Sequence, residues 1–527
     1  MKRKFIAVLS IFLLLLAGVY FWLPKTMYKR PRGIILISLD TLRADHLGIY
    51  GYYRNTSPFI DIFAKESIVF ENAVVQSATT LPSHMSIMTS LYPHSHGLTK
   101  NISLASENHT LAELLRKGGY ATAAFVDGGW MRGVFGFSQG FDLYEGEKTV
   151  GIAKILPKVK KWLDKNRSQP FFLFMHCYDI HSPYNPPPPY DTMFQDSVYD
   201  CSFVPTTNNL RSAAWNKVKL NDQDLRNVIA LYDGGIRYTD ERIEGFLAYL
   251  QNSGLYEDTL IIITSDHGEE FMEHGSFLHW QLYYRPNLHV PLIIHLPAYS
   301  KKEVRIGEFV QSIDLLPTIL DIAGLPDLPD AQGRSLVPLI NAHSDFLYYL
   351  WQHLVQYIKN DLPVSFAEVH NYTMRGRNVS VISDGFQMIY NQASHALQLF
   401  NILADPLTQD NVAKDHNDIV ERLLSEYTGF NSTVSQIETP TIVLNKQTEE
   451  QLEALGYIEV AEYAVKPVDS SGLGPIVLED DSDLDGVGDE NDNCRYVPNY
   501  TQKDKDADGI GDACDNHLEN SNTEKSG

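Results

Sequence analysis

Cysteine is scarce in this sequence, with 4 among 527 residues. Two of them, Cys177 and Cys201, lie in the middle of the chain, and Cys494 and Cys514 lie near its C-terminal end. So few cysteines exclude a disulfide scaffold for a chain of this length. Side-chain packing must therefore hold the fold together, and the 44% hydrophobic content is ample for a large core.

Basic charge is also in short supply, because 43 Lys and Arg face 66 Asp and Glu, which gives a formal net charge of -23. A nucleic-acid backbone is bound by an excess of Lys and Arg, so the composition excludes nucleic acid as a partner. The acidic charge is concentrated, since residues 479–515 hold 13 Asp and Glu against 3 Lys and Arg. The rest of the chain is only mildly acidic.

The N-terminus combines basic residues with a long apolar run. Residues 5–23 are apolar, and Lys and Arg flank them on both sides. At helical rise this run is about 28 Å long, enough to cross the bilayer core. The run ends in bulky residues and no small-x-small cleavage site follows, so we expect an uncleaved membrane anchor rather than a removed signal peptide. The catalytic part would then be periplasmic or extracellular.

Short apolar runs alternate with amphipathic helical stretches from residue 33 onward, which predicts an α/β domain with a largely parallel sheet. Three runs end at polar residues. The first stops at Asp40, the second at His176 with Asp179 and His181 beyond it, and the third at Asp266 and His267. One such Asp is ordinary turn chemistry, but the carboxyl ends of parallel strands share one edge, so we expect these side chains to converge.

Thr80 lies in a segment between these runs. Pro82 is suited to the first position of a helix, which would put Thr80 just before the helix N-terminus. Amide donors and the helix dipole there favour an anionic ester, and a metal-bound Thr oxygen can attack phosphorus or sulfur. The alternative is that Thr80 only caps the helix. The carboxylates and imidazole nearby suit zinc, manganese or calcium.

Several motifs together resemble the sulfatase family of the alkaline-phosphatase superfamily. They are Ile34-Ile-Leu-Ile-Ser-Leu-Asp-Thr-Leu-Arg-Ala-Asp, Thr80-Leu-Pro-Ser-His, Tyr92-Pro-His-Ser-His-Gly and Thr264-Ser-Asp-His-Gly-Glu, in that order. With weaker similarities, the resemblance covers about residues 33–456. It implies an α/β/α sandwich around a large, mostly parallel sheet, with a smaller C-terminal subdomain.

The chain departs from the family at the attacking residue. Sulfate-cleaving members carry Cys or Ser in a Cys-x-Pro-x-Arg signature, and that residue is oxidised to formylglycine, whereas this chain has Thr80, Pro82 and His84. Threonine would give a ketone at best, so no formylglycine is expected. A threonine nucleophile instead resembles the phosphoryl-transferring branches of the superfamily.

That resemblance implies a set of site residues. One divalent metal, zinc, manganese or calcium, would be bound by Asp40, Thr80, Asp266 and His267. His181 and His279 would bind substrate oxygens, protonate the leaving group or hold a second metal, and Asp179 would orient His181 or join that second site.

The acidic segment near the C-terminus contains two copies of one Asp-rich pattern, and Asp at every second position can surround a hard cation. It resembles thrombospondin type 3 repeats, which implies bound calcium and a disulfide between Cys494 and Cys514; the alternative is a plain solvated tail. The expected calcium ligands are Asp481, Asp483, Asp485, Asp489, Asp492, Asp504, Asp506, Asp508 and Asp512.

The sequence therefore predicts an anchor (residues 1–30), a catalytic domain (31–342), a C-terminal subdomain (343–460), a linker (461–478), calcium repeats (479–516) and a disordered end (517–527). The expected function is a metal-dependent hydrolase or transferase that acts on phosphate mono- or diesters through Thr80. Two alternatives stay open: sulfate-ester hydrolysis without formylglycine, and a catalytically silent binder of sulfated or phosphorylated surface polymers. The sequence indicates neither the oligomeric state nor the natural substrate.

Overall fold

The computed structural model describes residues 29–98, 103–196, 203–214, 218, 220–279, 283–297, 303–344, 365–369, 378–392, 394–432, 439–440 and 444–454. The apolar run of the predicted anchor, the linker, the calcium repeats and the end at 517–527 lie outside these residues. Across the described part of the chain, no helix is both long and apolar enough to cross a membrane.

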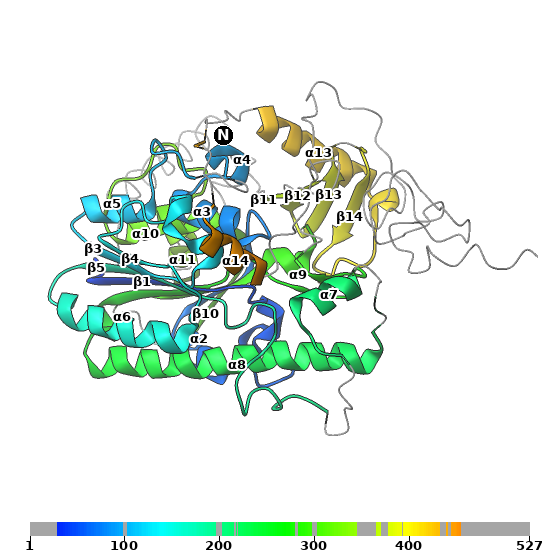
Figure 1. The fold of residues 1–527 in the computed structure, drawn as a ribbon. Helices are drawn as coiled ribbons and strands as arrows, with labels where there is room; N and C mark the ends of the chain where they lie inside the picture. The colour runs from blue at the N-terminus through cyan, green and yellow to red at the C-terminus, as the bar shows by residue number, and fades with distance from the viewer. Residues whose placement is uncertain are drawn as a thin grey trace, which may run out of the picture.

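An eight-stranded sheet forms the centre of the molecule, in the order β10-β2-β9-β6-β1-β5-β3-β4 (Figure 1). Strand β9 runs antiparallel to β2 and β6, and the other neighbours are parallel. This confirms the predicted largely parallel sheet. The strands are β1 (Gly33–Leu39), β2 (Ile68–Val74), β3 (Ala121–Phe125), β4 (Leu143–Glu145), β5 (Phe171–Cys177), β6 (Thr259–Thr264), β9 (His289–His295) and β10 (Val304–Gln311).

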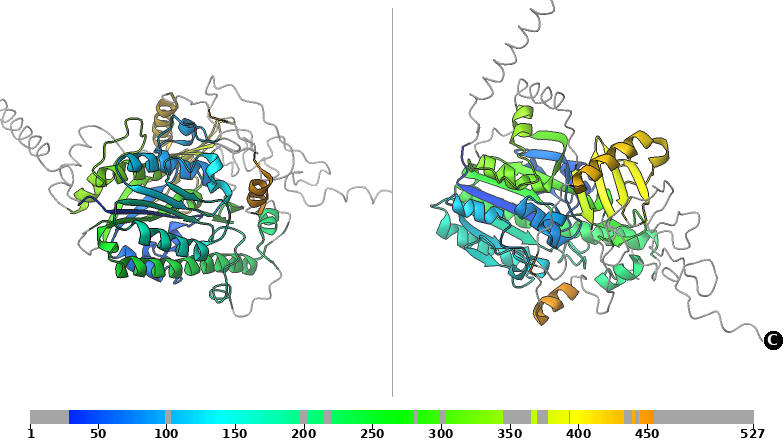
Figure 2. Two further views of the ribbon diagram at one scale, coloured as in Figure 1. Left: turned by 60° about the vertical axis from the view of Figure 1, so that its left-hand side comes forward. Right: turned by 90° about the horizontal axis from the view of Figure 1, so that it is seen from above.

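The three central strands are apolar on both faces because helices cover both faces. Along β1, Ile34 and Leu36 pack into one core, and Ile35 and Ile37 pack into the other. Figure 2 shows the resulting layers, with helices above and below the sheet. The helices of one side are α3 (Thr80–Thr89), α5 (Leu111–Lys117), α10 (Leu315–Ile322) and α11 (Val337–Ser344); those of the other are α2 (Pro58–Ala64), α6 (Ile152–Asn166) and α8 (Asp222–Asn252).

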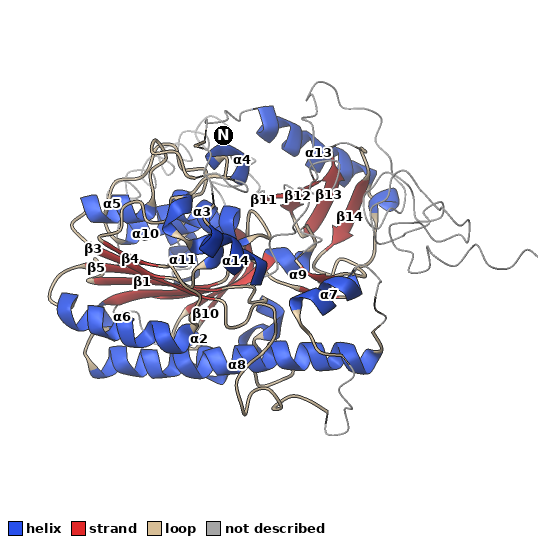
Figure 3. Cartoon of the chain, viewed as in Figure 1, coloured by secondary structure: helices blue, strands red, loops and turns tan. Residues whose placement is uncertain are grey.

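A second, antiparallel sheet of four strands lies beside the main body, as the red strands in Figure 3 show. It contains β11 (Ser365–Val369), β12 (Asn378–Ser383), β13 (Phe386–Asn391) and β14 (Leu397–Asn401), and α13 (Asn417–Ser432) packs against it. The sheet falls within the region where the sequence predicts a smaller subdomain.

Shorter elements connect these layers. The hairpin of β7 (Glu270–Phe271) and β8 (Phe277–Leu278) follows β6, and α7 (Thr207–Ala214) lies between β5 and α8. The remaining helices are α4 (Pro93–His96), α9 (Arg285–Leu288) and α14 (Lys446–Ala454).

Candidate active site

Three neighbouring strands place polar side chains at one edge of the main sheet. Strand β1 lies between β5 and β6 and is parallel to both. Asp40 follows β1, Asp266 lies just beyond β6, and His176 is the second-last residue of β5 rather than the residue after it. All three side chains are buried. The structure therefore brings together the polar ends of strands that the sequence predicts to converge.

The two carboxylates have one bonded and one unsatisfied oxygen each. Asp40 Oδ2 lies 2.9 Å from His176 Nε2, and Asp266 Oδ1 accepts from the backbone N–H of Thr41 at 3.3 Å. Asp40 Oδ1 and Asp266 Oδ2 are buried without a hydrogen-bond partner among the described residues. Imidazole nitrogens of His84 and His267 lie 3.3 and 3.4 Å from Asp266 Oδ2, but two adjacent buried carboxylates repel each other when both are ionised, so this pair of oxygens fits a divalent cation.

The charges of these carboxylates differ because their surroundings differ. Burial and the nearby charge of Asp266 raise the pKa of Asp40 well above its usual value. Although burial opposes it, the neighbouring imidazoles, His267 first, lower the pKa of Asp266. A cation close to both oxygens would favour the ionised form of each.

Thr80 is the first residue of α3, and Thr79 is the N-cap. The helix begins two residues earlier than Pro82 predicts, because proline is tolerated anywhere in a first turn, where no N–H bond is lost. Thr80 therefore does not occupy the capping position. It is fully buried, and its Oγ1 lies 3.4 Å from His267 Nε2.

His267 joins Thr80 to the carboxylate pair. Its Nδ1 lies 2.9 Å from the backbone oxygen of Gly268 and donates to it, which turns Nε2 towards Thr80. Burial lowers the pKa of His267, so the ring is neutral and able to bind a metal. Asp40, Asp266 and His267 each offer a ligand atom, and these atoms lie within 4.8 Å of one another. The arrangement fits the metal set that the resemblance implies.

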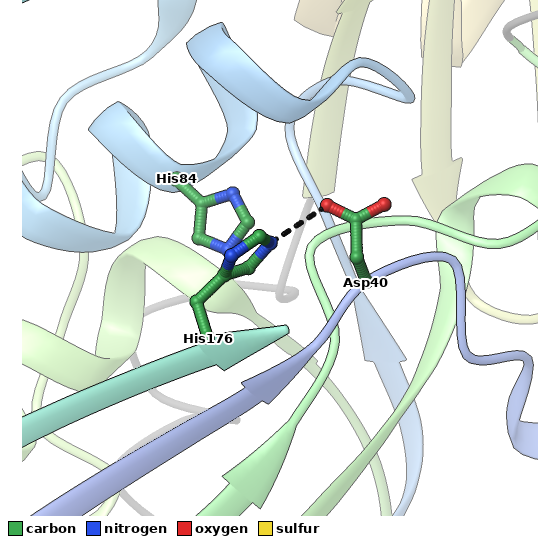
Figure 4. A group of neighbouring side chains, drawn as sticks. All are labelled: Asp40, His84 and His176. Carbon is green, nitrogen blue, oxygen red and sulfur yellow. Dashed lines mark hydrogen bonds and ion pairs between the residues drawn. The ribbon is translucent and has the colours of Figure 1, made fainter. Parts of the chain in front are cut away.

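Two further histidines lie beside these carboxylates, and the sequence predicted a role for neither. Figure 4 shows His84 and His176 beside Asp40, from α3 and β5. His84 Nε2 lies 2.9 Å from Ser38 Oγ, and its Nδ1 lies 3.0 Å from the Thr80 carbonyl oxygen and 3.3 Å from Asp266 Oδ2.

His176 Nδ1 accepts from the backbone N–H of Asp127 at 3.4 Å, so its Nε2 donates to Asp40. These two rings and Asp40 also lie close enough to hold an ion. Because every ring nitrogen of both histidines already has a protein partner, the geometry favours hydrogen-bonding support over ligation. A polar residue inside an otherwise apolar central strand was the signal for His176.

His181 and His279 lie on the other side of His267. The His279 ring centroid is 4.6 Å from that of His267 and 5.5 Å from that of His181. His181 Nδ1 lies 2.6 Å from the Ser182 carbonyl oxygen, and His279 Nδ1 lies 2.7 Å from Glu269 Oε1. Burial lowers the pKa of both histidines to about 4, so both are neutral at rest and can accept a proton or a metal.

Asp179 is bonded to the start of a helix. Its Oδ2 accepts from the backbone N–H of Ile152 at 2.7 Å, at the N-terminus of α6. Burial raises its pKa to about 6. The contact anchors a helix, and among the described contacts none joins the Asp179 carboxylate to His181.

Three sequence models of known families match the chain. The sulfatase model matches residues 32–325, and the C-terminal model of N-sulphoglucosamine sulphohydrolase matches residues 272–430. The thrombospondin type 3 repeat model matches residues 469–502 and 503–520, which contain the predicted calcium ligands and Cys494 and Cys514. These matches support the motif-based resemblances along the whole catalytic region and in the tail.

Curated relatives share about a quarter of the sequence over most of its length. Arylsulfatase K of Gallus gallus is 24% identical over 502 residues, which cover 83% of this chain and 90% of that protein. The multifunctional alkaline phosphatase superfamily protein PehA of Trinickia caryophylli is 24% identical over 476 residues, which cover 73% and 91%.

Solved structures share the fold at lower identity. A protein solved with its substrate D-glucosamine-2-N,6-O-disulfate has a TM-score of 0.64 at 20% identity, and covers 77% of this chain and 98% of its own. The phosphonate monoester hydrolase of Silicibacter pomeroyi has a TM-score of 0.61 at 19% identity, with coverages of 77% and 96%.

Because the sulfatase model covers more than half of the chain and the fold agrees, this chain belongs to the sulfatase family of the alkaline-phosphatase superfamily, as a hydrolase with thrombospondin type 3 repeats.

Proposed function

We propose that this hydrolase cleaves or transfers phosphate esters with Thr80 as its attacking residue. The observation that carries the proposal is the position of Thr80 Oγ1, 3.4 Å from His267 Nε2 and at the first residue of α3. Backbone N–H groups at that helix end favour the negative charge of a bound ester. Two carboxylates with unsatisfied oxygens lie beside it.

The metal set proposed for this site is Asp40, Thr80, Asp266 and His267. A divalent cation bound there would lower the pKa of the Thr80 hydroxyl and polarise the ester. His176 and His84 hold Asp40 and the start of α3 in place. His181 and His279, which are neutral at rest, would accept and return protons.

Phosphate esters are the favoured substrate class because threonine cannot be converted to formylglycine. Thr80 must therefore attack through its own oxygen, as in phosphoryl transfer. Sulfate-ester hydrolysis is the second candidate, and the arylsulfatase K relatives and the sulfatase model favour it. In either case His84 stands where the family signature has Arg.

We further propose that the enzyme acts outside the cytoplasmic membrane, with residues 5–23 as its anchor. The apolar run with basic flanks supports an anchor, and the match to thrombospondin type 3 repeats supports a calcium-rich, oxidising compartment. Calcium bound by the repeats and a disulfide between Cys494 and Cys514 belong to the same proposal.

The test uses the full chain, purified in detergent, and its Thr80→Ala and Thr80→Ser variants. Bound metal is measured, and aryl phosphate, bis-aryl phosphate and aryl sulfate are supplied as substrates. We expect phosphoester turnover that falls at least about 1,000-fold in Thr80→Ala and is partly retained in Thr80→Ser, which keeps a hydroxyl. Turnover unchanged in Thr80→Ala would exclude Thr80 as nucleophile, and bound metal without turnover of any ester would favour a silent binder.

A further inference from the structure

Glu269 is a buried carboxylate whose two oxygens are both bonded to side chains around the active site. Its Oε1 lies 2.7 Å from His279 Nδ1, and its Oε2 accepts from the Tyr184 hydroxyl at 2.7 Å. The backbone oxygen of Glu269 accepts from Arg43 Nη1 at 2.9 Å, which fixes the loop after β6. The side chain is fully buried, so this geometry is protected from water.

The partner of Nδ1 distinguishes His279 from the two histidines beside it. Backbone oxygens, of Ser182 and Gly268, accept from Nδ1 of His181 and His267. A backbone oxygen orients an imidazole but carries no net charge. His279 alone of these three rings has a carboxylate at Nδ1, and a carboxylate also stabilises the imidazolium that forms when Nε2 takes up a proton.

We propose that Glu269 is a positioning residue that makes His279 the proton carrier of the reaction. This proposal rests on the proposed function of Thr80 as the attacking residue. As the bond from Thr80 Oγ1 to phosphorus or sulfur forms, the hydroxyl proton of Thr80 passes to solvent and the bond to the leaving oxygen breaks. His279 Nε2 takes up a proton from solvent before this step and gives it to the leaving oxygen, and Glu269 balances the positive charge of the imidazolium in between.

The adjacent residue supplies a matched control. Glu270 is also fully buried and its Oε1 also bonds a histidine, His274 Nδ1 at 2.5 Å. The other nitrogen of His274 contacts the Thr408 backbone oxygen, and the ring stacks on Tyr284 with centroids 3.5 Å apart. The described contacts of this second pair are with Thr408 and Tyr284 and not with the proposed site residues, so its loss should leave the proton path unchanged.

The experiment compares Glu269→Gln with Glu270→Gln in the full chain. Esters of one acid with leaving alcohols from 4-nitrophenol to unsubstituted phenol and an alkyl alcohol are supplied, and kcat/KM is measured for each. A good leaving group can depart as an anion, whereas a poor leaving group must receive a proton as its bond breaks. For Glu269→Gln we expect kcat/KM to fall only a few-fold on the nitrophenyl ester and about 100-fold on the alkyl ester. Glu270→Gln should leave kcat/KM unchanged on all of them.

A loss in Glu269→Gln that is equal for all leaving groups would overturn the proposal, because it would indicate a structural effect. An undiminished effect of Glu269→Gln in a His279→Ala background would overturn it too, since the two residues should act as one unit. The nucleophile is tested separately: turnover that survives Thr80→Ala while the leaving-group trend persists would refute Thr80 and leave Glu269 in place.

Discussion

At the scale of single residues, the candidate site places two buried carboxylates close together, and a cation bound between them would offset their mutual repulsion. Asp40 Oδ1 and Asp266 Oδ2 have no hydrogen-bond partner in the described chain. A cation that binds the folded state and not the unfolded state stabilises the fold by about 4 kcal/mol when its concentration is 1,000 times its Kd. Metal removal should therefore weaken the fold as well as the activity.

Chelation is expected to lower the thermal midpoint of the full chain, and re-addition of zinc or manganese should restore it. Protons compete with the metal for Asp40, Asp266 and His267, so metal affinity should fall as the pH falls. Differential scanning calorimetry with and without chelator, at neutral and mildly acidic pH, measures both effects. In Asp266→Asn the chelator should shift the midpoint much less.

His176 offers a finer test of the same site, because it bonds Asp40 through Nε2. Replacing His176 by Leu removes this bond and should weaken metal affinity about 10- to 100-fold. Gln can donate from a similar place, so His176→Gln should lose much less. Equal affinities for the Leu and Gln variants in a metal titration would argue against this supporting bond.

Strand ends predicted that Asp40, Asp266 and His267 converge, and a predicted helix start marked Thr80; their role as metal ligands was implied by the family resemblance. His176 was expected to converge with these residues, but its role was not predicted; His84 and Glu269 were missed as functional residues, since their partners come from other elements. Asp179 also has a partner that no local pattern specifies, the start of α6, and its proposed part in a second site stays a prediction.

At the scale of elements, the loop after β6 fits closely against α9. The Gly268 N–H donates to the Asn287 backbone oxygen at 2.8 Å. A Cβ on Gly268 would lie 1.9 Å from the Pro286 backbone oxygen, which is far inside van der Waals contact. Only glycine therefore allows Asp266 and His267 to keep this position against the helix.

Gly268→Ala is expected to destabilise the fold by about 1–3 kcal/mol and to reduce kcat, because the metal-binding loop must move. Gly245→Ala is the control, since a Cβ there meets nothing within 4 Å on helix α8. It should be neutral or stabilise the protein by up to about 1 kcal/mol. Urea denaturation and steady-state kinetics of both variants check this; similar behaviour of the two would refute the close-contact argument.

The predicted strands match β1, β5 and β6 closely because long apolar runs that end in polar residues are strong signals. The order of strands in the sheet and the antiparallel direction of β9 could not be predicted in the same way. They depend on which edges pair across distant parts of the chain, and a local pattern carries no information on that.

At the scale of the whole molecule, a buried ion pair joins the catalytic body to the small sheet. His274 bonds Glu270 through Nδ1 and the Thr408 backbone oxygen through Nε2. Although burial opposes it, the Glu270 carboxylate raises the pKa of His274 above its ordinary value. The junction is therefore strongest when His274 is protonated.

A raised pKa in the folded state gives stability that is complete below the unfolded pKa of about 6.5 and is lost as the pH rises through the folded value. We expect the thermal midpoint to fall by a few degrees as the pH rises from about 6.5 through the folded-state pKa of His274, and to fall less in His274→Gln. Scanning calorimetry at several pH values measures it. The same slope in the variant and the parent chain would rule out His274 as the source.

The acidic tail gives a prediction of another kind. Calcium should increase the ordered structure of residues 479–516, because it neutralises carboxylates that otherwise repel one another. Circular dichroism and protease resistance of the full chain, with calcium and with magnesium as control, measure the change. No change on calcium addition would favour a plain acidic tail.

The central place of β1 in the sheet affects how the chain is made. Gly33 in β1 pairs with Phe171 on one side and Thr259 on the other, so its partners are synthesised much later. Until then both edges of an apolar strand are open, and such edges are prone to aggregate. Non-local pairing of this kind folds slowly. The newly made N-terminal part should therefore depend on chaperones until β6 leaves the ribosome, and fragments that end before β6 should be recovered as inclusion bodies.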